Sequence, residues 1–250
     1  MGNLKVTIVG SGGAALTKER SCPCILVEDE ALLDCGSGSL KNLRQLGVDL
    51  QGIERVLLSH LHNDHVGDLA SIIWTMQMEG RKPPLEICGP RGTKGFVAQM
   101  LRLVRTPKDF LKFQVSCLDL VDDVRHDTFK WCRGEHVPEG RAYRIDGDRS
   151  LCYSGDTRPS PKVVQLANGA DLLIHDSVLP ADELEAAVKS NHSTAAEAGE
   201  VADKAGASTL ILFHILGRGS GYEERLRREA SERFTGKVLV ARDLMVLNIP

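Results

Sequence analysis

Three histidines and one aspartate lie within six consecutive positions, as His60, His62, Asp64 and His65. They follow Arg55 to Leu58, whose apolar residues predict a short buried strand. Side chains two positions apart on extended backbone point the same way, so His60 and His62 can bind one cation, while Asp64 and His65 suit a second. These ligand types fit zinc, iron or manganese, whereas calcium and magnesium prefer oxygen ligands. The alternative is a polar loop that is histidine-rich by chance, which is uncommon directly after a buried strand.

Other apolar runs also end in side chains that could bind metal or transfer protons. These runs begin at residues 150, 171 and 209 and predict three further strands. Their terminal groups are Asp156 after the first run, His175 and Asp176 after the second, and His214 after the third. Helix-covered sheets place active sites at the carboxyl edge of their strands, so we expect these groups to converge. A lone histidine, His136, precedes another predicted strand at residues 142–145.

His192 lies beside the start of a predicted helix. Thr194 and Glu197 have the spacing of a capping box, and Gly206 marks the end of that helix. Backbone N–H groups and the dipole at a helix N-terminus favour a phosphate. His192 therefore lies where a phosphate would be favoured, and the alternative is an exposed loop histidine.

The remaining pattern predicts alternating strands and helices. Strands are expected at residues 5–9, 25–27, 31–34, 238–241 and 244–249, and helices at residues 39–46, 68–78, 94–104 and 222–234. The glycine loop at residues 10–13 could suggest a dinucleotide site. Its G-x-G-x-x-G pattern is incomplete because residue 15 is alanine, so a Rossmann fold is not favoured.

Residues 74–127 are expected to shape the substrate pocket. Trp74, Met76 and Met78 could line its mouth, but core or dimer contacts explain them at least as well. Basic residues in this segment could steer an anionic substrate, although a solvated helix face also explains them. They are Arg102, Arg105, Lys108 and Lys112.

Composition limits the classes of function. At 250 residues and 42% hydrophobic, the chain can bury a substantial core. A net charge of −3 gives no overall basic field, but a small anionic substrate remains open because bound cations reverse the local charge. No signal peptide or membrane span is recognisable, so the cytoplasm is the expected location. The seven scattered cysteines are expected to be reduced, with a soft-metal site at Cys22 and Cys24 as a weak alternative.

The run at residues 60–65, His-Leu-His-Asn-Asp-His, is the H-x-H-x-D-H pattern of the metallo-β-lactamase superfamily. Nearly the whole chain resembles the branch that contains ribonuclease Z and related phosphodiesterases. The resemblance implies a single domain over residues 1–250 with an α/β fold, the four-layer αββα metallo-β-lactamase sandwich, and a homodimer. It also implies two divalent metal ions, with zinc expected and manganese or iron as alternatives. The first ion would be held by His60, His62 and His136, the second by Asp64, His65 and His214, and Asp156 would bridge them.

The same resemblance implies a mechanism in which a metal-bridging hydroxide attacks the substrate. His192 would be the general acid that protonates the leaving alkoxide, with Asp176 as its orienting partner, and Asp64 completes the implied catalytic set. Asp34 lies in a D-x-G-x-G element and would orient a metal ligand. Arg218 falls at the offset from His214 where ribonuclease Z carries an arginine, although the residues between them differ.

The chain departs from ribonuclease Z in two places. The family's His-Glu-Ala-Thr run is His-Asp-Ser-Val at residues 175–178, so the carboxylate of Asp176 is shorter. Only nineteen residues separate His136 from Asp156, which leaves no room for the extended arm that grips the tRNA elbow. We therefore predict a phosphodiesterase for a small or single-site anionic substrate, such as a cyclic nucleotide or an RNA 3′-end.

Other functions remain open for the same site. The first alternative is a hydrolase of lactones, sulfate esters or other esters, which needs no acid beside a phosphate pocket. The second is an arm-less tRNA 3′-processing endoribonuclease. A di-iron redox role lacks a flavodoxin-like domain, and non-catalytic relatives usually lose ligands, so both are less favoured.

Overall fold

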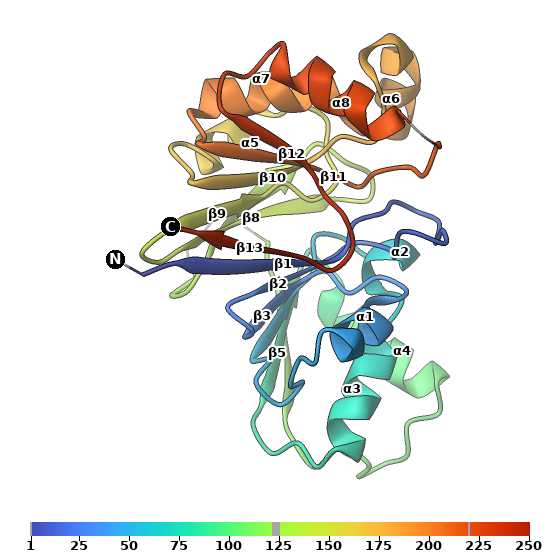
Figure 1. Cartoon of the computed structure of the whole chain (residues 1–250). Coiled ribbons are helices and arrows are strands. Elements are labelled where there is room, and N and C mark those ends of the chain that lie inside the picture. The colour runs from blue at the N-terminus through green and yellow to red at the C-terminus, as the bar shows by residue number, and fades with distance from the viewer. Residues whose placement is uncertain (1, 122–125, 220) are drawn as a thin grey trace.

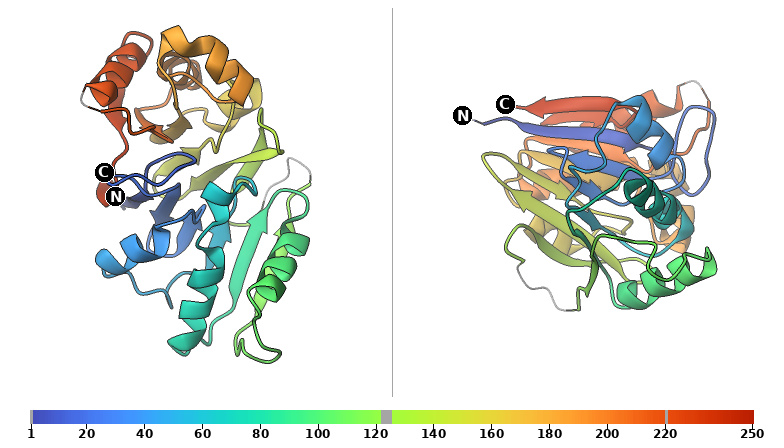
Figure 2. Two further views of the ribbon diagram at one scale, coloured as in Figure 1. Left: turned by 90° about the vertical axis from the view of Figure 1, so that its right-hand side faces the viewer. Right: turned by 90° about the horizontal axis from the view of Figure 1, so that it is seen from below.

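The computed structural model describes residues 2–121, 126–219 and 221–250. Two β-sheets pack face to face, and helices cover the outer face of each sheet (Figures 1 and 2). This arrangement confirms the predicted α/β fold and αββα sandwich. The two chain ends lie together because the last strand pairs with the first, placing Leu4 opposite Ile249.

The first sheet mixes antiparallel and parallel strands. Its order is β13, β1, β2, β3, β4, β5 and β6, and every pair from β3 to β6 is parallel. Its strands are β1 (Leu4–Gly10), β2 (Cys24–Val27), β3 (Ala31–Leu33), β4 (Arg55–Leu57), β5 (Leu85–Gly89), β6 (Val115–Asp119) and β13 (Met245–Ile249). The helices of this half are α1 (Ser39–Gln45), α2 (Asn63–Val66), α3 (Leu69–Met78) and α4 (Thr93–Leu103).

The second sheet has the order β12, β11, β10, β9, β8 and β7. Strands β9 to β12 are parallel, so the chain leaves β9, β10 and β11 at the same edge. Its strands are β7 (Lys130–Gly134), β8 (Gly140–Asp146), β9 (Ser150–Tyr153), β10 (Leu172–Asp176), β11 (Thr209–Phe213) and β12 (Lys237–Val240). The helices of this half are α5 (Pro161–Leu166), η1 (Ala181–Glu183, a 3₁₀ turn), α6 (Leu184–Ser190), α7 (Ala195–Ala205) and α8 (Tyr222–Ser231).

The central strands are buried on both faces. In β11, Ile211 and Phe213 belong to the core between the sheets, whereas Leu210 and Leu212 belong to the core shared with α7 and α8. Double burial explains why these strands appear in the sequence as unbroken apolar runs.

The capping-box pattern correctly predicted the start of the helix that contains residue 200. The Thr194 hydroxyl accepts a hydrogen bond from the Glu197 N–H at 3.2 Å, and Glu197 accepts one from the Thr194 N–H at 2.9 Å, which confirms the capping box. Gly206 follows α7 in the left-handed conformation. The last helix was predicted too long, since α8 ends at Ser231 and the chain then turns to bury Phe234.

Several predictions about single residues can be compared with the structure. None of the seven cysteines forms a disulfide, and Cys22 and Cys24 belong to none of the candidate metal-binding groups in the described residues. Met76 is fully buried and therefore a core residue, whereas Trp74 lines a surface groove of about 440 Å³ beside α4. Residues 122–125 of the predicted pocket-shaping segment lie outside the described residues. In the described parts of the chain, no helix is both long and apolar enough to cross a membrane.

Candidate metal centre

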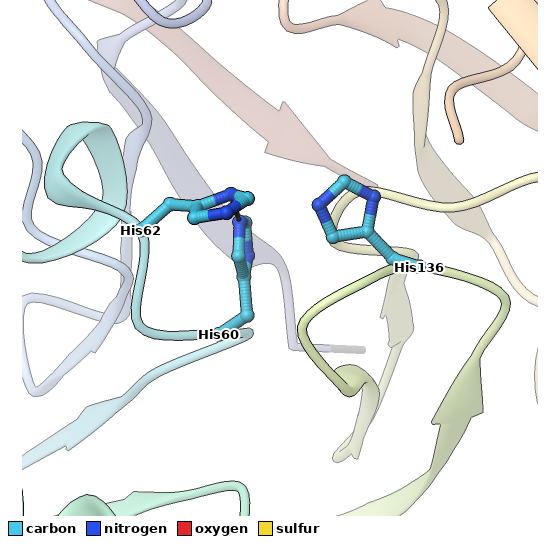
Figure 3. Close-up of side chains that lie close together, drawn as sticks. All are labelled: His60, His62 and His136. Atoms are coloured by element: carbon cyan, nitrogen blue, oxygen red, sulfur yellow. Dashed lines mark hydrogen bonds between the residues drawn. The ribbon is translucent and has the colours of Figure 1, made fainter. Parts of the chain in front are cut away.

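Three histidines form one cluster at the edge between the two sheets. His60 and His62 lie on the loop after β4, and His136 faces them from the loop after β7 (Figure 3). His60 Nε2 lies 2.9 Å from His62 Nδ1, and the His60 and His136 ring centroids are 4.7 Å apart. One nitrogen from each ring lies within 4.8 Å of the others, so the three can hold one ion.

A second cluster joins Asp64, His65, Asp156 and His214, all of them buried. His65 Nε2 lies 3.2 Å from Asp156 Oδ2 and 3.4 Å from Asp64 Oδ2. His214 Nε2 is 3.3 Å from each of the same two oxygens. The Asp156 oxygen also lies 3.8 Å from His60 Nε2, which places this carboxylate between the two clusters.

The unpaired atoms of these clusters fit bound cations. The Nε2 atoms of His65 and His136 are buried and make no hydrogen bond. A buried polar atom without a partner costs about 1–3 kcal/mol, and an ion in each cluster would satisfy one of these nitrogens. Imidazole nitrogens with carboxylate oxygens are a donor set for zinc, manganese or iron. These residues therefore fit a divalent metal site with two adjacent positions.

Charge in the clusters suits metal binding. Burial lowers the pKa of His60 to about 2, so its imidazole is neutral and offers a lone pair at neutral pH. Burial alone would raise the pKa of Asp156, but nearby His214 and His65 outweigh it and hold that pKa well below the ordinary value. Burial likewise opposes ionisation of Asp64, yet the nearby His214 and His65 lower its pKa. Both carboxylates are therefore ionised at neutral pH.

Asp34 fixes the orientation of the His65 ring. Its buried carboxylate lies 2.8 Å from His65 Nδ1 and accepts hydrogen bonds from the Ser59 N–H at 2.7 Å and the Tyr153 hydroxyl at 2.8 Å. Because Tyr153 ends β9 in the second sheet, Asp34 also ties the two halves together at the site. Ligand orientation by a hydrogen-bonded carboxylate is the role that the D-x-G-x-G element suggested.

His192 and Asp176 form a pair beside both clusters. His192 Nδ1 lies 2.9 Å from Asp176 Oδ2, and the His192 ring stacks on His214 with centroids 5.0 Å apart. The shorter carboxylate of Asp176 thus reaches its histidine. Burial alone would lower the pKa of His192, but the adjacent charge of Asp176 outweighs it and raises the pKa to about 9. Since Nδ1 is bound to Asp176, Nε2 is the ring atom left for a substrate.

Two residues that contact site side chains through their backbone were not found by the sequence analysis. The Thr157 N–H donates to Asp176 Oδ2 at 3.0 Å, and the Asn191 carbonyl lies 3.0 Å from His136 Nδ1. Side-chain type carries no signal for such contacts. Only the positions of Thr157 and Asn191 next to Asp156 and His192 could have indicated them.

Two other residues named from the sequence are engaged elsewhere. Arg218 pairs with Glu183 at 2.6 Å and lies over the ring of Tyr222. His175 is fully buried, with Nδ1 2.7 Å from the carbonyl oxygen of Asp176. Neither belongs to the candidate metal-binding groups found among the described residues.

Known proteins resemble this chain along most of its length. The ribonuclease Z of Aeropyrum pernix is 31% identical over 311 aligned positions, which cover 100% of this chain and 99% of that relative. The crystal structure of the short form of human tRNase Z matches with a TM-score of 0.84 and 25% identity, covering 98% of this chain and 99% of the human one. The metallo-β-lactamase fold protein YhfI from Bacillus subtilis matches with a TM-score of 0.81 and 25% identity, over 98% and 99% of the two chains.

The fold, the paired His/Asp clusters and these similarities define a metal-dependent hydrolase of the metallo-β-lactamase superfamily, in its ribonuclease Z-like branch. A family model described as "Anti-Pycsar protein Apyc1" matches residues 4–197, and the chain belongs to that family.

Proposed function

We propose that the protein is a phosphodiesterase with two divalent metal ions, in which His192 is the general acid. The observation that carries this proposal is the His192–Asp176 pair, 2.9 Å apart and directly beside the two clusters. Hydrolysis of an ester with a good leaving group needs no such acid. A phosphodiester whose leaving group is an alkoxide does need one, because the alkoxide is a strong base.

The proposed ligands follow the two clusters. His60, His62 and His136 would hold the first ion and Asp64, His65 and His214 the second, and Asp156 lies where it could serve both. Zinc is the expected metal because imidazole nitrogen dominates the donor set, with manganese or iron as alternatives. When bound, such ions supply hydroxide at neutral pH and stabilise negative charge on a phosphoryl oxygen.

The protein's own groups complete the reaction. Asp34 holds the His65 ring in place, and Asp176 holds His192 with Nε2 free. As the P–O bond breaks, the Nε2 proton of His192 passes to the leaving oxygen. The Asp176 carboxylate keeps His192 protonated before that step and fixes the direction of the transfer.

A small phosphodiester is the proposed substrate, either a cyclic nucleotide or a short RNA 3′-end. Strands β8 and β9 occupy most of the chain between His136 and Asp156, and their hairpin closes at once, with Asp146 opposite Ser150. The alignment with the Aeropyrum ribonuclease Z has 311 positions, 61 more than the 250 residues of this chain. A tight hairpin without an arm supports a substrate that needs no remote grip.

The second candidate is the arm-less tRNA 3′-processing endoribonuclease. The names of the relatives favour it, because ribonuclease Z and tRNase Z cover almost the whole chain. Exposed basic residues at the end of α4 and just beyond it would suit a polyanion. These are Arg102, Arg105, Lys108 and Lys112.

Metal analysis combined with a substrate panel tests the proposal. The panel contains bis-p-nitrophenyl phosphate, a cyclic nucleotide, an acyl lactone and a tRNA precursor under one set of conditions. We expect about two metals per chain and cleavage of the cyclic nucleotide that falls about 10²–10⁴-fold in His192→Ala. His126→Ala is the matched control, because His126 stacks on Phe129 away from the clusters. Turnover of the lactone alone, or an unchanged rate in His192→Ala, contradicts the proposal, and preference for the tRNA precursor selects the second candidate.

A further inference from the structure

We infer that Arg158 is a positioning residue for the general acid, because its guanidinium holds the backbone of His192. The inference rests on the proposed function. Arg158 Nη1 donates to the His192 carbonyl oxygen at 2.6 Å and to Glu197 Oε2 at 2.8 Å, while Nη2 pairs with Glu197 Oε1. The hydrogen bonds of the guanidinium are with the His192 carbonyl and Glu197, so this side chain reaches the acid through the backbone of His192.

Arg158 and Glu197 form a clamp on the His192 backbone, and its Glu197 end is fixed at the start of helix α7. Glu197 Oε2 also accepts from the Thr194 N–H at 2.9 Å, within the capping box that begins α7. The side chains of Arg158 and Glu197 are only 20% and 19% exposed. A planar guanidinium can bind both carboxylate oxygens and a carbonyl at once, whereas an ammonium group cannot match that geometry. The clamp therefore needs arginine.

Arg158 belongs to a three-residue segment that positions both members of the acid pair. Asp156 lies between the two clusters, the Thr157 N–H binds Asp176 Oδ2 at 3.0 Å, and Arg158 binds the His192 carbonyl. The segment is itself anchored, because the Arg158 N–H donates to the Glu135 carbonyl at 3.0 Å. The Asp176 carboxylate and the His192 backbone are thus both held by the loop after β9.

Two further hydrogen bonds hold the loop that carries His192, so we expect loss of the Arg158 guanidinium to reduce the rate only partly. The His192 N–H donates to the Ala187 carbonyl at 2.9 Å, and the Ser193 hydroxyl donates to the Thr157 carbonyl at 2.6 Å. Without the clamp, the loop keeps its course but the imidazole loses its fixed distance from the leaving oxygen. A misplacement of about 1 Å can cost up to about 10²-fold in rate, and we expect roughly a tenth of that here.

Leaving-group dependence separates positioning of the acid from a merely structural role. An alkoxide leaving group needs the proton, whereas p-nitrophenolate leaves without it. In Arg158→Lys we expect kcat for the cyclic nucleotide to fall about tenfold and kcat for bis-p-nitrophenyl phosphate to change less than about twofold. Metal content should remain that of the wild type.

Arg149→Lys is the matched control. Arg149 pairs with Asp171 at 3.1 Å at the opposite end of the same strands, so its loss tests the general cost of breaking such a pair. We expect both substrates to be turned over at wild-type rates in this variant. Glu197→Gln removes the charge that holds the clamp while keeping an acceptor for the cap, and should lower the cyclic-nucleotide rate alone.

A second measurement does not depend on turnover. The hydrogen-bonded Nδ1–H of His192 should give a downfield proton resonance in the metal-free protein, assigned by its absence in His192→Ala. We expect this resonance to persist in Arg149→Lys and to broaden or disappear in Arg158→Lys. Equal losses on both substrates, no loss on either, or an unchanged resonance in Arg158→Lys overturns the inference. Wild-type protein that cleaves no phosphodiester refutes the proposed function instead, and the resonance still decides the role of Arg158.

Discussion

The two halves of the molecule build the site in different ways. The first half contributes one continuous stretch, residues 60–65, in which the buried carboxylate of Asp34 orients the His65 ring. The second half contributes groups from separate segments, among them His136, Asp156 and His192, joined by a network of hydrogen bonds through residues 156–158. The ligands of a local motif are brought together by their spacing along the chain. Ligands from separate segments come together only when the strands that carry them have paired in the sheet. Substitutions in the two halves should therefore fail differently.

The largest effect is expected at Asp156, where the halves meet. Its carboxylate lies within 3.8 Å of nitrogens from His60, His65 and His214. Asp156→Ala should reduce bound metal to below about one ion per chain and lower kcat about 10³-fold or more, because metal ions contribute several kcal/mol of charge stabilisation. Metal analysis after dialysis, together with turnover, checks this. His62→Ala is the comparison, since His62 is exposed and belongs to the first cluster alone. Equal metal loss in the two variants would show that Asp156 does not link the clusters.

Substitution of Asp34, which orients His65 in the first half, should have the next largest effect. Asp34→Asn keeps the shape but weakens acceptance from His65, Ser59 and Tyr153. Loss of an orienting partner typically costs about 10–100-fold in metal affinity or activity, and we expect that range here. Titration with zinc in the presence of a competing chelator measures the affinity. Tyr153→Phe removes only one of these hydrogen bonds and should cost less. A larger loss in Tyr153→Phe would place the support in the second sheet instead.

The contribution of the His192–Asp176 pair in the second half should be visible in the pH dependence of turnover. A general acid works only while protonated, and Asp176 raises the pKa of His192 to about 9. Turnover of a substrate with an alkoxide leaving group should therefore decline as the pH rises past the pKa of His192 in the metal-loaded protein. Asp176→Asn removes the charge that raises this pKa, so the decline should move about one to two pH units lower. Bound cations lower the pKa in both proteins, and the order of the two profiles is unaffected.

The bis-p-nitrophenyl phosphate profile provides the control for that measurement. Its leaving group needs no proton, so the decline that belongs to His192 should be missing from it in both proteins. If Asp176→Asn shifts the two substrates alike, the titrating group is not the acid. In that case the difference between the halves would lie in metal binding alone.

The sequence predicted the fold and the clustered groups well because both depend on patterns that are local along the chain. Double burial produces apolar runs, and residues 60–65 carry a metal-binding motif within six positions. The support of the second half was not predictable in the same way. Arg158 binds the His192 carbonyl, while the Thr157 N–H and the Asn191 carbonyl contact the side chains of Asp176 and His136. These partners come close only when the sheet has formed. Residue type says nothing about a backbone partner, so these roles required the structure.

The smallest effect should come from the helix cap that anchors the second half. Thr194→Ala removes the hydroxyl that accepts from the Glu197 N–H, which should cost about 1 kcal/mol of unfolding free energy. Thr194→Ser retains the hydroxyl and serves as the control in denaturant unfolding. The helix of the metal-binding motif differs, because α2 has His62 as its N-cap without a side-chain cap, and the His65 carbonyl accepts instead from the Cys35 N–H at 2.9 Å. Activity in Thr194→Ala should change less than about threefold, since Glu197 still binds Arg158 and Arg158 still binds His192. A loss of activity as large as that of Arg158→Lys would mean that the cap, and not the guanidinium, fixes the acid.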